Sequence, residues 1–126
     1  MKKAVCYITV GCVLTLGAVQ LSAVPASKAT IMGEVIDIAS YAMKDSLGEE
    51  NAEAGRFRAE GGFPIGILTE EGDVYVAIYR KPAPASVLET ANAVLGELMG
   101  KQVVARGRTF DAAGVKVIEV SIASEM

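Results

Sequence analysis

The segment that decides the fold is Phe63–Arg80, which reads FPIGILTEEGDVYVAIYR. Two apolar runs, 63–69 and 74–80, are rich in residues that favour β-strands. The polar EEGD sequence between them contains the glycine that a tight connection needs. Alternation in the second run places three β-branched residues on one face and Tyr75 and Tyr79 on the other. The segment therefore predicts a β-hairpin.

Further elements are predicted on both sides of this hairpin. A strand is expected at 31–39, followed by a loop over 40–48 and a short helix over 49–60 that Gly61-Gly62 ends. Ser86 and Glu89 form a capping box ahead of a helix over 86–99, which Gly100 stops. Two more strands are expected at 102–110 and 115–123. The order β-β-β-α-β-β predicts a five-stranded, Greek-key barrel of the OB-fold type, mainly β, with a helical insertion after the first strand.

The N-terminal segment predicts an exported protein. Lys2 and Lys3 precede an uncharged apolar run over 4–19, and small residues follow up to Ala29. This is the pattern of a secretory signal peptide, with cleavage after Ala26 or Ala29. The mature domain would be 30–126 and would be periplasmic or secreted. An uncleaved membrane anchor is the alternative, because the apolar stretch approaches the length that spans a bilayer. A lipid anchor at Cys12 is disfavoured because the apolar run continues past it.

Composition excludes several kinds of site. Cys6 and Cys12 lie in the leader and the chain has no histidine, so the mature domain lacks thiol chemistry, His-dependent catalytic triads and the usual zinc ligands. Loss of Lys2 and Lys3 leaves 10 basic residues against 15 acidic ones. That acidic balance argues against a nucleic-acid or membrane-surface partner. We expect no enzyme and no cofactor.

Three groups of segments resemble a family of small, exported bacterial OB-type proteins that are mostly uncharacterised. They are Gly33–Asp37, then Gly62–Leu68 with Gly72–Tyr75, and Gly100–Gly107 with Ile118–Val120. Members of this kind often carry a cysteine after the first strand and a histidine and two cysteines in the following helix, which suits a metal or a redox cofactor. The matching positions here are Ser40, Asn51, Ala54 and Arg58, and none keeps its ligand type. The resemblance thus implies the fold and the compartment without a metal site.

Five residues make the candidate binding surface: Tyr75, Tyr79, Arg106, Arg108 and Phe110. OB-folds commonly bind ligands across their strands, where aromatic rings and cations serve sugars, peptides or nucleotides. The function expected is a non-catalytic binding or accessory domain whose ligand is a protein, a peptide or a small molecule. The surface of the 40–61 insertion is a second place for such contacts. The alternative function is a degenerate relative of a metal- or redox-cofactor-binding protein that has lost its ligands.

Charged residues outside that surface are expected to be structural. Glu34 and Asp37 lie three apart on a strand, which points them to opposite faces and rules out a paired acid and base. Arg58 is expected to form exposed ion pairs with Glu53, Glu60 or Glu50 at helical spacing. An acidic cluster is read as a solvated face because its spacing matches no calcium loop: Asp45, Glu49, Glu50 and Glu53.

Overall fold

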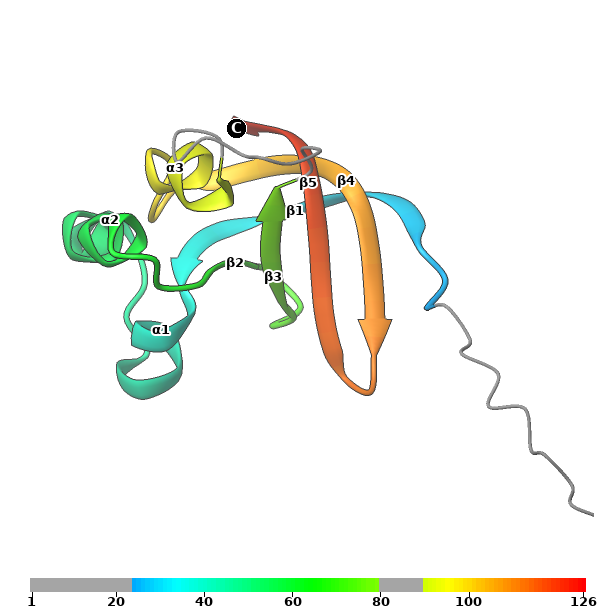
Figure 1. Ribbon diagram of the computed structural model, residues 1–126. Helices are drawn as coiled ribbons and strands as arrows, with labels where there is room; N and C mark the ends of the chain where they lie inside the picture. The colour runs from blue at the N-terminus through cyan, green and yellow to red at the C-terminus, as the bar shows by residue number, and fades with distance from the viewer. Residues whose placement is uncertain (1–23, 80–89) are drawn as a thin grey trace, which may run out of the picture.

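A computed structural model describes residues 24–79 and 90–126 and shows a closed five-stranded β-barrel with short helices (Figure 1). The strand order around the barrel is β1-β2-β3-β5-β4, which is OB-fold-like and confirms the predicted architecture. The strands are β1 (Ser27–Asp37), β2 (Ile65–Leu68), β3 (Val74–Tyr79), β4 (Gln102–Ala112) and β5 (Val115–Glu125). All neighbouring pairs are antiparallel except β3 and β5, which are parallel.

Strand β1 closes the barrel because it pairs with two neighbours. Its first part, Ser27–Glu34, pairs with β4, and its last part, Glu34–Asp37, pairs with β2. Gly33 lies where the strand passes from one neighbour to the other. A Cβ atom there would lie 2.2 Å from the carbonyl oxygen of Leu68. Only a residue without a side chain permits this close backbone approach.

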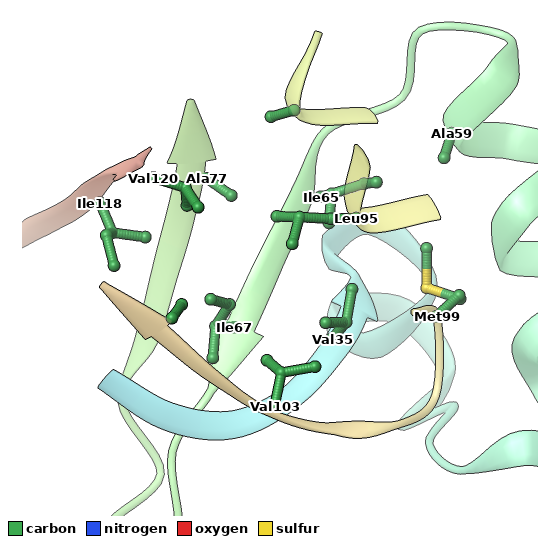
Figure 2. Close-up of a cluster of buried hydrophobic side chains, with 12 residues drawn as sticks. Val35, Ala59, Ile65, Ile67, Ala77, Leu95, Met99, Val103, Ile118 and Val120 are labelled. Carbon is green, nitrogen blue, oxygen red and sulfur yellow. The ribbon is translucent and has the colours of Figure 1, made fainter. Parts of the chain in front are cut away.

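The barrel interior is a single apolar core (Figure 2). Val35, Ile67, Val103 and Ile118 are fully buried, one from each of four strands. Leu95, also fully buried, comes from the helix α3 (Ala91–Gly96) and lies beside Ile65 in Figure 2. Burial of a large aliphatic side chain stabilises the fold by about 1.5–3 kcal/mol. The helix thus plugs one end of the barrel.

The helical insertion after β1 contains one helix more than expected. Helix α1 (Ile38–Lys44) occupies part of the predicted loop, and that prediction was wrong. Asp37 caps the helix by accepting a hydrogen bond from the backbone N–H of Ala39. The predicted helix at 49–60 is confirmed as a 3₁₀ turn, η1 (Glu49–Asn51), that leads into α2 (Ala52–Glu60). Helices α1, α2 and α3 lie on one side of the barrel in Figure 1.

The helix predicted over 86–99 is shorter. Its capping box falls at 86–89, outside the described residues, and within the described part the helix begins only after Thr90. Thr90 has an extended backbone, and its side chain accepts a hydrogen bond from the N–H of Ala93. A Thr N-cap therefore starts the helix, which ends at Gly96 instead of Met99.

The C-terminal hairpin is longer than predicted, because β4 continues to Ala112 and β5 to Glu125. Its turn is made by Ala113 and Gly114, which both have positive φ angles, as a two-residue hairpin turn of type I′ requires. The β4–β5 register shifts between Arg106 and Gly107, which marks a β-bulge. Among residues 24–79 and 90–126, no helix has the length and apolar character to cross a membrane.

We predict that Gly33→Ala lowers the free energy of unfolding by about 1–3 kcal/mol, the cost typical of forcing atoms into a packed site. The added methyl group would collide with backbone, which cannot move aside as a flexible side chain can. Chemical denaturation measures the effect. Gly96→Ala is the control: its Cβ would meet only Ala59 at 3.9 Å, and alanine is the better helix former. Equal losses for the two variants would contradict the role assigned to Gly33.

Candidate functional site

Three of the five predicted binding residues lie together on the outside of β4. A single residue of β4 separates Arg106 from Arg108, and another separates Arg108 from Phe110. Each of these two intervening residues is paired with a buried residue of β5. Because alternate residues of a strand point to opposite faces, all three side chains point away from the core. The guanidinium carbon of Arg108 lies 5.7 Å from the centre of the Phe110 ring, within the range of a cation–π contact. The structure thus brings this part of the predicted surface together.

The two tyrosines do not lie on that outer face of β4, although Tyr75 lines a separate hollow together with Phe110. Tyr75 is paired with the fully buried Ile67, and Tyr79 with the buried Val120, so both face the core side of β3. Ile78, expected on the opposite face, is 45% exposed. Strand β5 also separates β3 from β4. The prediction that all five residues share one surface was therefore wrong, because alternation defines two faces but does not say which one is buried.

Residues from β1 and β5 complete the surface around the two arginines. Lys28 lies directly opposite Arg108, and Thr30 lies directly opposite Arg106. Together with Ser121 these residues line a shallow hollow of about 380 Å³. We call Lys28, Thr30, Arg106, Arg108 and Ser121 the cationic surface. Sequence reasoning missed Lys28 because the predicted strand began at Ile31, although the alternation of apolar and polar residues runs back from Ile31 to Lys28.

The charges on the cationic surface are only partly balanced. Glu119, with a side chain 9% exposed, accepts hydrogen bonds from Nε and Nη2 of Arg108 at 3.0 and 2.6 Å. Within the described part of the chain, neither Lys28 nor Arg106 forms an ion pair. Like charges directly opposite each other on neighbouring strands destabilise a sheet, and Lys28 and Arg108 are such a pair. The surface therefore has an excess of positive charge that an anion would neutralise.

A second polar cluster joins the barrel to its helical insertion. Asp37 is 5% exposed and accepts hydrogen bonds from the Ser40 hydroxyl at 2.7 Å and from Nε of Arg58. Burial alone would raise the pKa of Asp37. Hydrogen bonds from Ser40, Arg58 and the backbone of Ala39, together with the guanidinium charge, outweigh burial and hold the pKa below its usual range. The carboxylate is thus ionised at neutral pH.

The partner of Arg58 differs from the prediction. Arg58 pairs with Asp37 on β1, and the expected pairs with Glu53, Glu60 or Glu50 were wrong. The exposed network on α2 belongs instead to Arg56, which pairs with Glu60 and with Glu97 of the segment after α3. Sequence spacing indicates neighbours along a helix and cannot reveal a partner on a distant strand. Arg58 therefore anchors α2 to the barrel.

Three of the four positions that the resemblance equates with ligands meet at this junction. Ser40, Asn51 and Arg58 line a cavity of about 10 Å³, close to the space that a single water molecule needs, whereas Ala54 is exposed. Glu34 and Asp37 also line it, although strand alternation predicted that their side chains point to opposite faces. In the described ranges, no group of three or more His, Cys, Asp or Glu residues is arranged to hold a metal ion.

No protein-family model matches the chain, and comparisons with curated proteins and with solved structures give no match. The candidate site consists of a positively charged outer surface on β1, β4 and β5 and a partly buried ion pair at the insertion.

We predict that Arg58→Ala lowers the free energy of unfolding by about 1–3 kcal/mol at pH 7, because it leaves a buried carboxylate with fewer donors. Arg56→Ala is the matched control. The ion pairs of Arg56 are exposed, so this variant should lower the free energy of unfolding by less than about 1 kcal/mol.

The Arg58→Ala effect should also depend on pH. Because folding lowers the pKa of Asp37, the contribution of the ionised group is complete above its unfolded pKa, about 3.9. It is lost as the pH falls through the folded pKa. Urea unfolding at pH 7 and pH 3 should show the wild-type and Arg58→Ala stabilities converging at low pH. A difference that stays constant with pH would contradict the assignment.

Proposed function

We propose that this chain is an exported, non-catalytic OB-type binding domain that holds an anionic group on its cationic surface. The observation that carries the proposal is the cross-strand arrangement of Lys28, Arg106 and Arg108 around one hollow. The mature chain has a net negative charge by composition. Positive charge gathered on one outer face is therefore a local feature that favours a local anionic partner.

The geometry suits a small ligand. The hollow of about 380 Å³ lies within the range of small-molecule sites but is shallow. Arginine presents a planar set of donors that matches a carboxylate or phosphate group, and lysine adds a point charge. The hydroxyl groups of Thr30 and Ser121 provide neutral donors beside them. We therefore assign the ligand to the class of small molecules that carry a carboxylate or phosphate group.

Arg106 is the residue best placed to recognise the ligand. It is exposed and forms no ion pair among the described residues, so its donors are available. Arg108 already donates to Glu119 and serves chiefly to place positive charge beside the hollow. The binding affinity should be low and salt-dependent, because the exposed charges are well screened at physiological ionic strength.

We predict that citrate and inorganic phosphate, used as probes, shift backbone amide NMR signals of residues 28–30, 105–108 and 120–122. Arg106→Ala should weaken binding about tenfold, equivalent to about 1.4 kcal/mol. Lys28→Ala should weaken it several-fold, and binding should weaken further as salt is added.

Lys44→Ala is the control for net charge. Lys44 is exposed at the end of α1. Lys44→Ala therefore removes one positive charge, as Arg106→Ala does, but leaves the cationic surface intact. Binding that weakens equally in Lys44→Ala and Arg106→Ala would show only a general charge effect. Signal shifts spread over the whole barrel would likewise contradict the proposed site.

A further inference from the structure

The barrel begins at a defined residue. Strand β1 starts at Ser27, and residues 24–26 before it are exposed and outside any strand. Ser27 is already paired with Thr109 on β4. Its Oγ lies 2.9 Å from Oγ1 of Thr109. The first residue of the closed barrel is thus held by a side-chain contact as well as by its place in the strand ladder.

The two cleavage positions allowed by the leader have different consequences. The β1–β4 register runs over eight residue pairs, from Ser27↔Thr109 to Glu34↔Gln102. Cleavage after Ala26 leaves every pair intact. Cleavage after Ala29 removes Ser27, Lys28 and Ala29, so three pairs are lost and the matching stretch of β4 becomes an open edge.

The same comparison applies to the cationic surface. Lys28 lines the hollow and lies opposite Arg108. Cleavage after Ala29 would remove this charge, whereas cleavage after Ala26 keeps it. Cleavage after Ala26 also creates an α-ammonium group on Ser27, next to Lys28 in the sequence. An α-amino group has a pKa of about 7.7–8.0 and is largely charged at neutral pH.

We propose that the processing site of this chain is the Ala26–Ser27 peptide bond, so that the leader is removed at the first residue of the barrel. A processing peptidase hydrolyses this bond with one water molecule, leaving a carboxylate on Ala26 and an ammonium group on Ser27. The residues before the bond, Val24-Pro25-Ala26, supply the small side chain that such cleavage requires. The inference rests on the export in the proposed function and specifies the mature N-terminus.

The test is the intact mass and N-terminal sequence of the protein after expression of the full chain, with a C-terminal tag, in a Gram-negative host. We expect a chain that begins at Ser27. Ala26→Leu should reduce the processed fraction at least tenfold, because a large residue replaces the small one before the bond. Ala29→Leu, the matched control, should be processed at the same bond as the wild type.

The possible outcomes separate this inference from the proposed binding function. An exported chain that begins at Thr30, or processing blocked by Ala29→Leu but not by Ala26→Leu, would overturn the inference while leaving export intact. A chain that is never cut would contradict both the inference and the prediction that the leader is removed. A chain that begins at Ser27 but binds neither citrate nor phosphate supports the processing site and contradicts the ligand assignment.

Discussion

The double pairing of β1 is the constraint on which the rest of the structure depends. A single strand pairs with β4 along its first part and with β2 along its last part. Without that change of neighbour, the sheet would have two open edges and the core would be exposed on one side. Gly33 permits the change because the backbone of Leu68 occupies the space of a side chain. The cationic surface also depends on it, since β1 carries Lys28 to a position opposite Arg108.

Asp37 extends this constraint to the helices. It is the last residue of β1, the N-cap of α1 and the partner of Arg58 on α2. One carboxylate thus fixes the end of a strand, the start of one helix and the position of another. A buried charge is costly unless its hydrogen bonds are satisfied. No buried side-chain polar atom lacks a partner among the described residues, and the cluster meets this requirement.

Features that depend on local pattern could be predicted from the sequence. Strand alternation and turn residues gave the β2–β3 hairpin and the element order, and these were sufficient for an OB-like barrel. Features that depend on tertiary contacts could not be predicted. Because the other face of β3 carries β-branched residues, the sequence predicts that Tyr75 and Tyr79 are on the surface. In the structure the face that carries the tyrosines packs against the core. The pair Arg58–Asp37 spans 21 positions, beyond any local rule.

For the candidate site, Arg106, Arg108 and Phe110 were placed on one face by alternation alone. Lys28 was not found, because its role appears only when β1 is seen beside β4. Helix α1 was missed for a related reason: the residues at 40–48 have weak helical periodicity, and the cap that starts the helix belongs to the preceding strand. Local patterns thus define faces and elements, whereas cross-strand neighbours define the site.

The pairing of Ser27 with Thr109 has a consequence for the order in which the protein folds. These residues are 82 positions apart, and synthesis proceeds from the N-terminus. The β2–β3 hairpin can form early, but β1 must wait for β4 until most of the chain has been made. Contacts between such distant residues slow folding because a long loop has to close first. Barrel closure therefore follows the synthesis of β4, and until then the first part of β1 lacks the neighbour with which it pairs.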